Sequence, residues 1–266
     1  MTDPVVTRLR AAGCVFAEDE ARELREAATS PDHLDALLAR RVDGEPLEYV
    51  VGFAEFDGLR IAVSPGVFVP RRRTAFLVRT AAARAPANAT CLDLCCGSGA
   101  LGAAFAARVP GSEVHAADID PVAVRCARHT LPPGRVYESD LFATLPAALR
   151  GRVDVLLANV PYVPTAALAS MPVEARDHEP PRTHDGGPDG LDIARRVLAE
   201  AAHWLAPGGV LYIEIAEHQR DAARTAVESA GLTPRLDADD DLGATIVSGT
   251  NDRPEWSSPA RAAWIP

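Results

Sequence analysis

The sequence predicts an α/β fold in which a mostly parallel, doubly wound sheet follows a small helical domain. From residue 90 onward, short apolar strands alternate with helices, as expected for parallel strands that are covered on both faces. Up to about residue 45 the pattern is helical. We therefore expect a small helical N-terminal domain over 1–45, a linker with a β-hairpin over 46–69, an α/β domain over 70–250 and a C-terminal tail over 251–266.

The N-terminal half supplies signals for each of its elements. Helix formers over 18–28 predict a first helix, and Ser30-Pro31 provides a cap and a first-turn proline for a second helix through Arg41. Residues 46–52 are expected to be a short link. Asp57-Gly58 joins two apolar runs, which predicts a hairpin of 53–56 with 59–63. Residues 74–85 are again helical in pattern.

Beyond residue 90 the strands and helices alternate. The predicted strands are 90–95, 113–117, 135–138, 153–158, 209–215, 233–236 and 244–248. The predicted helices are 100–109, 121–130, 191–205 and 219–230. Residues 159–190 break this rhythm because they are rich in Pro, Gly and charge, and connections of that length are usually functional or disordered. Ligands of such sheets bind at the carboxyl ends of the strands.

Composition excludes several classes of protein. The 266 residues carry 27 basic and 37 acidic side chains, and the resulting net charge of −10 counts against a large electrostatic grip on nucleic acid. No apolar run is long enough to span a bilayer, and the N-terminus lacks the features of a secretory signal. The cysteines are odd in number, five, and the three at 91, 95 and 96 crowd one apolar stretch without CxxC pairs or nearby histidines. We therefore expect reduced thiols, no metal site and a cytoplasmic location.

An apolar strand runs directly into a glycine turn at residues 91–102. Gly97, Gly99 and Gly102 match the GxGxxG dinucleotide pattern, which is weak evidence when it stands alone, since such turns can also serve packing. Asp93, four residues before the first glycine, favours a cationic ligand over a pyrophosphate. S-adenosylmethionine, with its ammonium and sulfonium, therefore fits better than NAD. The predicted cofactor-binding residues here are Asp93, Cys95, Cys96, Gly97, Ser98 and Gly99.

Two further acids follow the next two strands. Asp118 ends the second strand, where an acid is placed to bind both hydroxyls of a ribose. Asp140 follows the third strand and is placed to accept a hydrogen bond from an adenine amino group, while Leu141 is placed to cover the ring. Taken singly, Asp140 is a common turn residue. The ordered series of Asp93, Asp118 and Asp140 is what favours a nucleoside-bearing ligand.

A third motif, Asn159-Val160-Pro161-Tyr162, follows the apolar strand 153–158. A side-chain oxygen at a strand end and a backbone held open by proline offer two acceptors to a planar –NH₂ group. Tyr162 adds a stacking face. The motif is therefore a candidate receptor for an amide or an exocyclic amine, although a plain turn has the same residues.

At this point the sequence resembles a known family. The tetrapeptide resembles the Asn-Pro-Pro-Tyr signature of methyltransferases that act on planar nitrogens. The wider pattern is similar to the protein-(glutamine-N(5)) methyltransferases that modify the Gly-Gly-Gln loop of peptide chain release factors. The stretches that carry the resemblance are 46–52, Phe56, Gly58, 66–71, Thr74, 93–99, 118–121, 139–142, 159–162, Glu179-Pro180, 186–192 and 208–215.

The resemblance implies a Rossmann-like, S-adenosylmethionine-dependent methyltransferase that acts on the side-chain amide of a glutamine in a protein. It implies catalytic roles for Asn159, Val160 and Tyr162. It also implies that Asn159–Tyr162, including Pro161, bind the substrate and that Asn159 contributes to the cofactor site. The side-chain oxygen of Asn159 and the carbonyl of Val160 are expected to accept the two amide hydrogens. No dedicated general base is evident, and the proton can leave after transfer.

The chain also departs from the family pattern. Val160 stands where the family has proline, which preserves the backbone acceptor. Residues 72–75 read Arg-Arg-Thr-Ala where the family usually has Pro-Glu-Thr-Glu. The family's N-terminal domain is longer than the 45 residues here. We expect Arg71–Arg73 to form a solvated basic turn, or else a contact for an acidic partner surface.

Three other functions share parts of this pattern. An adenine-N(6) nucleic-acid methyltransferase would use the same acceptor pair with Tyr162 stacked on a flipped base, but it would normally show a basic surface. A nicotinamide-dependent oxidoreductase would explain GxGxxG but not Asp93 or the amide receptor. A catalytically silent protein that binds the cofactor would explain the departures at Val160 and residues 72–75.

Overall fold

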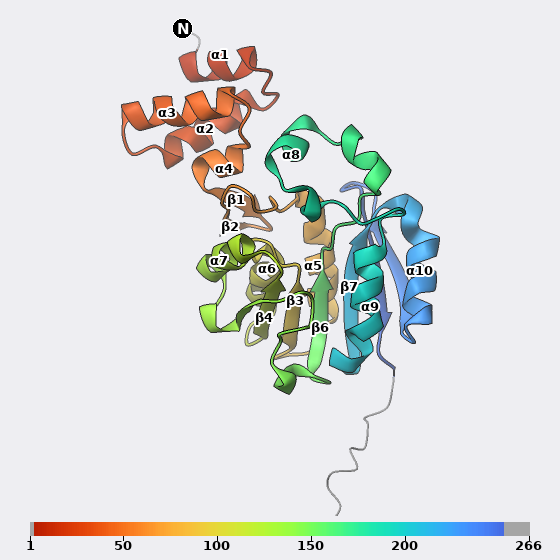
Figure 1. The fold of residues 1–266 in the computed structure, drawn as a ribbon. Helices are drawn as coiled ribbons and strands as arrows, with labels where there is room; N and C mark the ends of the chain where they lie inside the picture. Colours follow the sequence, from red (N-terminus) through yellow and green to blue (C-terminus); the bar gives the residue numbers. More distant parts are fainter. Residues whose placement is uncertain (1–2, 253–266) are drawn as a thin grey trace, which may run out of the picture.

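The central feature of the fold is a seven-stranded sheet, seen in a computed structural model that describes residues 3–252 (Figure 1). Its strand order is β5-β4-β3-β6-β7-β9-β8. Strands β5 through β7 pair in parallel, whereas β9 runs antiparallel to both of its neighbours. The strands are β3 (Thr90–Leu94), β4 (Glu113–Asp118), β5 (Val136–Glu138), β6 (Val153–Ala158), β7 (Leu205–Ile215), β8 (Thr233–Asp239) and β9 (Ala244–Thr250). The predicted, mostly parallel sheet is confirmed.

Helices cover both faces of this sheet. Side chains of β3 alternate between the faces, so that Leu92 packs in one core and Cys91 in the other. Helices α5, α6 and α7 bury their apolar residues on the Cys91 face, and α9 and α10 on the Leu92 face. The helices are α5 (Ala75–Arg84), α6 (Ala100–Arg108), α7 (Pro121–Thr130), α9 (Asp192–Trp204) and α10 (Arg220–Ser229). The doubly wound arrangement is therefore also confirmed.

The N-terminal helices have an apolar core of their own. They are α1 (Pro4–Ala11), α2 (Ala17–Ala27) and α3 (Pro31–Val42). The predicted cap of α3 is confirmed, because the Ser30 hydroxyl accepts a hydrogen bond from the His33 amide at 3.1 Å. The buried apolar residues of this cluster are Val5, Val6, Leu9, Ala17, Ala21, Leu24, Leu37, Leu38 and Val50.

The linker holds one expected and one unexpected element. The predicted hairpin is confirmed as β1 (Phe53–Phe56) and β2 (Leu59–Ala62). Asp57 and Gly58 have φ of 51° and 83°, the left-handed conformation that favours a two-residue hairpin turn. The stretch expected to be a short link instead contains a helical turn, α4 (Leu47–Val51), which ends at Gly52 with φ of 84°.

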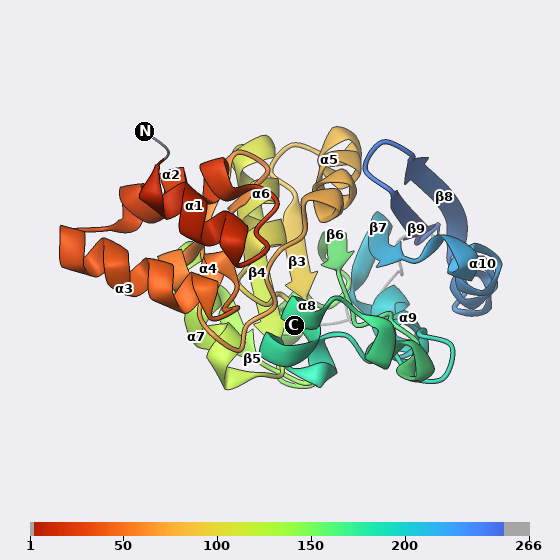
Figure 2. The ribbon, with the colours of Figure 1, turned by 90° about the horizontal axis from the view of Figure 1, so that it is seen from above.

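The long connection between β6 and α9 passes over the carboxyl ends of the parallel strands. It contains a short helix, α8 (Val173–His178), and several 3₁₀ turns. Figure 2 looks down on the molecule and shows α8 between the N-terminal helices and the rest of this connection. The connection is thus placed to cover whatever binds at the strand ends.

Some whole-chain expectations concern absences or lie outside the described residues. Of the tail over 251–266, all but the first two residues lie outside the part that the structure describes. Among residues 3–252, no helix is both long and apolar enough to cross a membrane. The same residues contain no group of three or more His, Cys, Asp or Glu side chains that could hold a metal ion.

Candidate active site

A cavity of about 380 Å³ lies at the carboxyl ends of β3, β4 and β6. Its size is within the range typical of small-molecule sites. One wall is formed by the strand ends. The other is formed by residues 66–73, the segment between β2 and α5 that we call the linker region from here on, and by residues 171–184. We call residues 171–184 the strap. The lining residues at the strand ends are Cys95, Cys96, Gly97, Ser98, Asp118, Ile119, Asp120, Asn159, Val160, Pro161 and Tyr162.

The turn after β3 gives its backbone to the cavity. Cys95 and Gly97 both have positive φ, 55° and 54°, so the chain reverses sharply before α6 begins. Gly97 and Ser98 line the cavity together with Cys95 and Cys96. A Cβ built at Gly97 would meet only the Phe68 carbonyl, at 3.9 Å, so this glycine leaves open space above the turn. Residues 95–98 therefore line the cavity, and their predicted contacts with a cofactor stay predictions.

The other two glycines of the pattern serve packing. A Cβ at Gly99 would lie 3.0 Å from the Leu131 side chain, and one at Gly102 would lie 3.0 Å from Val114. Neither glycine lines the cavity. The GxGxxG match therefore combines one residue that faces the cavity with two that let α6 approach its neighbours. The cofactor-binding role predicted for Gly99 stays a prediction.

Asp118 faces the cavity with a preorganised carboxylate. Its Oδ2 accepts a hydrogen bond from the Gly97 amide and its Oδ1 accepts one from the Asp120 amide, both at 2.9 Å. Burial raises the pKa of Asp118, and these two backbone donors act against that rise. A carboxylate has about four acceptor positions, so about two remain for a ligand. This geometry fits the predicted binding of ribose hydroxyls.

Asp93 lies beneath the turn and outside the cavity lining. It is 1% exposed, and its Oδ2 accepts a hydrogen bond from the Gly102 amide at 2.9 Å. Its Oδ1 is buried and has no hydrogen-bond partner among the described residues. Burial raises the pKa of Asp93 to about 7. In the structure Asp93 thus binds the first turn of α6 through the Gly102 amide. Its direct contact with a cofactor stays a prediction.

Asp140 and Leu141 are not brought into the cavity lining. Both Asp140 oxygens lie 2.8 Å from Arg196 of α9, and this ion pair is about half exposed. Leu141 is buried in the core on the α9 face, with φ of 50°. The structure therefore does not bring these two residues to the cavity, and their predicted adenine contacts stay predictions.

The Asn159–Tyr162 motif lines the cavity as expected. The Asn159 Oδ1 atom is buried and has no hydrogen-bond partner among residues 3–252. Val160 is 2% exposed, and its side chain packs in the core. It can therefore present only its backbone to the cavity. Buried acceptors without a partner are costly, and an unpaired one beside a cavity is a candidate contact for a ligand donor.

Tyr162 is held at its hydroxyl by two charged side chains. The hydroxyl donates to Glu214 Oε1 at 2.9 Å and accepts from Arg73 Nη2 at 2.7 Å. Burial and the Glu214 carboxylate raise the pKa of Tyr162 to about 12, so the phenol stays protonated. The expectation of a solvated basic turn is wrong for Arg73, because this residue also pairs with Glu214 at 3.1 Å.

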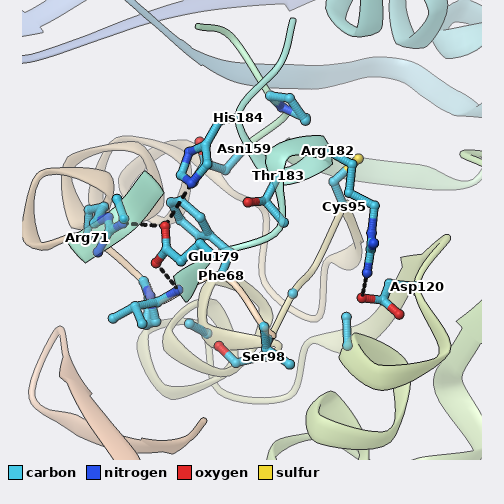
Figure 3. A pocket seen from close by; sticks show the side chains of 18 of the residues that line it. Phe68, Arg71, Cys95, Ser98, Asp120, Asn159, Glu179, Arg182, Thr183 and His184 are labelled. Carbon is cyan, nitrogen blue, oxygen red and sulfur yellow. Dashed lines mark hydrogen bonds and ion pairs between the residues drawn. The ribbon is translucent and has the colours of Figure 1, made fainter. Parts of the chain in front are cut away.

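Glu179 joins the strap to the linker region (Figure 3). Its buried carboxylate accepts hydrogen bonds from the Val69 amide at 3.1 Å and from Arg71 at 2.6 Å. His184 Nε2 lies 2.8 Å from the same carboxylate. The Phe68 ring contacts His184 edge to face, with the ring centres 5.7 Å apart. Arg71, like Arg73, is therefore an ion-paired residue of the cavity wall, with part of its side chain still exposed.

Two more ion pairs tie the strap to its surroundings. Arg182 pairs with Asp120, a cavity-lining residue that caps α7 (Figure 3). Glu174 of α8 pairs with Arg41 of α3 at 2.9 Å. The sequence reasoning missed these strap contacts. The only signal for any of them was Glu179-Pro180, which belonged to the resemblance and had no assigned role.

Comparisons with known proteins agree with this geometry. The Methyltransferase small domain family matches residues 58–175. The chain is 36% identical to the release factor glutamine methyltransferase of Geobacter sulfurreducens over 83% of this chain and 79% of that protein. It is 38% identical to the enzyme of the same name from Streptomyces coelicolor, over 80% of this chain and 82% of that protein.

The chain belongs to the release factor glutamine methyltransferase family. It is thus a methyltransferase whose methyl donor is S-adenosylmethionine.

A relative of a different name also matches. The chain is 35% identical to the 4-amino-L-phenylalanine/4-methylamino-L-phenylalanine methyltransferase of Streptomyces pristinaespiralis, over 71% of this chain and 72% of that protein.

The fold has solved counterparts as well. A methyltransferase from Pyrococcus furiosus superimposes with a TM-score of 0.54 over 73% of this chain and 89% of that one, at 15% identity. At that identity the match supports the Rossmann-like methyltransferase fold alone.

Proposed function

We propose that this enzyme transfers a methyl group from S-adenosylmethionine to the side-chain amide nitrogen of a glutamine in a substrate protein. We propose that this substrate is a peptide chain release factor. The observation that carries the proposal is the Asn159 Oδ1 atom, which is buried at the cavity and has no hydrogen-bond partner in the described part of the chain. A primary amide offers two N–H donors in one plane. Asn159 Oδ1 and the Val160 carbonyl are the acceptors proposed for them.

The cofactor side of the cavity fits S-adenosylmethionine. Asp118 has acceptor positions left for the ribose hydroxyls, and the open backbone over Gly97 and Ser98 suits the methionine portion. When bound, the cofactor supplies an electrophilic methyl group. Asp118 orients the sugar, and Arg182 of the strap pairs with Asp120 on the same side of the cavity.

The chain's own contribution to the reaction is positioning. An amide nitrogen is a poor nucleophile because its lone pair is delocalised, so the rate depends on holding that nitrogen in line with the methyl group. Asn159 and Val160 fix the plane of the amide, and their oxygens stabilise the positive charge that grows on its hydrogens. The nitrogen becomes strongly acidic after transfer, so the proton leaves without a dedicated base.

Two observations favour a protein glutamine over the other substrates: the net charge of the chain and its sequence similarity to named relatives. The net charge of −10 counts against a nucleic-acid substrate. The candidate basic patch was Arg71–Arg73, and two of its three arginines, Arg71 and Arg73, are engaged by buried carboxylates. An oxidoreductase would leave the Asn159 acceptor without a role. The two relatives named for release factors cover most of the chain.

The 4-amino-L-phenylalanine enzyme marks the second candidate. Its named substrate also presents a planar –NH₂ group, so the same acceptor pair would serve it. A substrate comparison must therefore include a free aromatic amine beside the protein.

In the test, the enzyme is incubated with isotopically labelled S-adenosylmethionine and one of three kinds of substrate. These are a release factor carrying a Gly-Gly-Gln loop, 4-amino-L-phenylalanine, and nucleic acid (DNA or RNA). We expect label on the glutamine of the loop, located by mass spectrometry. Asn159→Ala should lower turnover by at least about 100-fold while cofactor affinity in calorimetry changes only a few-fold. Asp118→Ala is the matched variant and should lose cofactor affinity instead. Unchanged turnover in Asn159→Ala, or label on another substrate alone, would overturn the proposal.

A further inference from the structure

The hydroxyl of Tyr162 is gripped by side chains from two distant parts of the chain. Glu214 comes from the carboxyl end of β7, which is the parallel neighbour of β6 in the sheet. Arg73 comes from the 3₁₀ turn before α5. The three side chains are mutually bonded, since Arg73 reaches both the Tyr162 hydroxyl and the Glu214 carboxylate.

Glu214 needs a cation because it is buried. Its side chain is 3% exposed, and its Oε2 has no hydrogen-bond partner among the described residues. Removing the cation from such a pair leaves an uncompensated charge in a poorly solvated place. Arg73 supplies the cation at 3.1 Å, and within residues 3–252 Glu214 has no other ion-pair partner.

The arginine run distinguishes Arg73 from its neighbour. Both residues are exposed at the surface, but Arg73 lines the cavity and Arg72 does not. The Arg72 guanidinium makes no hydrogen bond or ion pair with any of the residues that the structure describes. The two positions have the same charge and adjacent backbones, so only the contacts made by the side chains differ.

We propose that Arg73 is a positioning residue that fixes the Tyr162 ring as the wall beside the acceptor site. The proposal rests on the proposed function, since the ring matters for turnover only if Asn159 holds the acceptor amide next to it. A tyrosine ring anchored only at its Cβ can rotate about two side-chain bonds. A hydroxyl that both donates and accepts within a charged pair holds the far end too, so the ring keeps one orientation before the substrate arrives.

The guanidinium geometry is part of the mechanism. Arg73 uses Nε toward Glu214 and Nη2 toward Tyr162, two donors held in one plane. A lysine could supply the charge for Glu214 but would offer a single, mobile donor group. We therefore expect Arg73→Lys to keep Glu214 neutralised and to hold Tyr162 less well.

Fluorine NMR can measure whether the Tyr162 ring keeps one orientation. The chain has four tyrosines, so labelling with 3-fluorotyrosine gives few fluorine NMR signals, and Tyr162→Phe identifies the one of interest. We expect Arg73→Ala to shift and broaden the Tyr162 signal and leave the other three unchanged. The same variant should lower kcat about tenfold, as expected for loss of a hydrogen bond to a charged group, at unchanged cofactor affinity. Arg73→Lys should fall between, and Arg72→Ala should match the wild type.

Two results would overturn the proposal. One is a Tyr162 fluorine signal that does not change in Arg73→Ala. The other is a variant whose KM for the protein substrate rises at unchanged kcat, since that would make Arg73 a contact for the partner surface. If the wild-type protein fails to methylate glutamine, the proposed function fails, while the fluorine spectra still decide whether Arg73 orders the ring.

Discussion

The two walls of the cavity hold their carboxylates with different partners. At the sheet edge, Asp118 is bonded by the backbone amides of Gly97 and Asp120, both close to it in the fold of the strand ends. On the strap, Glu179 is bonded by Val69 and Arg71, more than 100 residues away in sequence. The first carboxylate keeps acceptor positions for a ligand, whereas the second is used to join segments of the protein.

This difference distinguishes a carboxylate that is placed to bind a ligand from one that holds the strap against the rest of the cavity wall. A carboxylate that is held by backbone amides is fixed whenever the sheet is folded, because those amides belong to the strand ends themselves. Glu179, by contrast, is held by an amide and a side chain of a segment distant in sequence, so it is fixed only when the two segments meet. We therefore infer that the sheet edge is ready to bind before the strap is closed. Variants of the strap should reveal this as effects on stability and access.

The largest expected effect is that of Glu179→Ala. Its carboxylate is 1% exposed, and its loss leaves Arg71 and the Val69 amide without their partner. Breaking a buried pair from one side should lower the free energy of unfolding by about 3 kcal/mol. Urea denaturation measures the change, and KM for the protein substrate should rise.

Two controls accompany Glu179→Ala. Glu179→Gln keeps an acceptor for the Val69 amide and should cost less. Glu228→Ala removes an exposed carboxylate of α10 and should leave stability nearly unchanged. If Glu179→Ala were as stable as Glu228→Ala, the strap would not depend on this carboxylate.

The same contrast explains what the sequence could predict. The strand 153–158 was predicted with the observed bounds, and Asn159 follows from it, because the carboxyl ends of neighbouring parallel strands meet at one edge. Asp118 was predictable for the same reason. In both cases the residue's place depends only on its own strand and on the period of the pattern.

Other parts depend on contacts that no local pattern carries. The arginines at 71 and 73 look like a solvated run, because nothing near them in sequence indicates that Glu179 and Glu214 will lie against them. Strand β7 begins at Leu205, four residues before the predicted start. Leu205 pairs with Val153, and the register between β6 and β7 then shifts. The Pro-Gly-Gly sequence that follows Ala206 is typical of a turn, so it did not indicate a strand. Local signals predicted the sheet and its edge, but not the ion pairs that close it.

Asp93 offers a test of the sheet side through pH. Burial raises its pKa to about 7 in the folded protein, against 3.8 for the ordinary carboxyl. The folded state therefore binds the proton more tightly, so the stability contributed by protonated Asp93 is complete below pH 3.8 and is lost as pH rises toward 7. The slope is about 1.4 kcal/mol for each pH unit within that window.

The measurement compares the wild type with Asp93→Asn, which cannot titrate but still offers an oxygen to the Gly102 amide. Denaturation between pH 5 and pH 8 should show the wild type losing stability relative to the variant as pH rises. A difference that stays constant with pH would mean that Asp93 is already charged in the folded protein over this range.

The smallest expected change in stability comes from Arg182→Ala, and it bears most directly on the two walls. The Arg182 side chain is 57% exposed, so its pair with Asp120 should contribute less than about 1 kcal/mol to folding. Arg196→Ala is the matched control, because the Arg196 side chain is exposed to a similar extent and its pair with Asp140 lies outside the cavity lining. Stopped-flow measurement should find that S-adenosylmethionine dissociates several-fold faster from Arg182→Ala and at the wild-type rate from Arg196→Ala. If Arg196→Ala is the variant that changes the rate, then Asp140 belongs to the cofactor site, as its position after the third strand predicts. The strap would in that case not be what retains the cofactor.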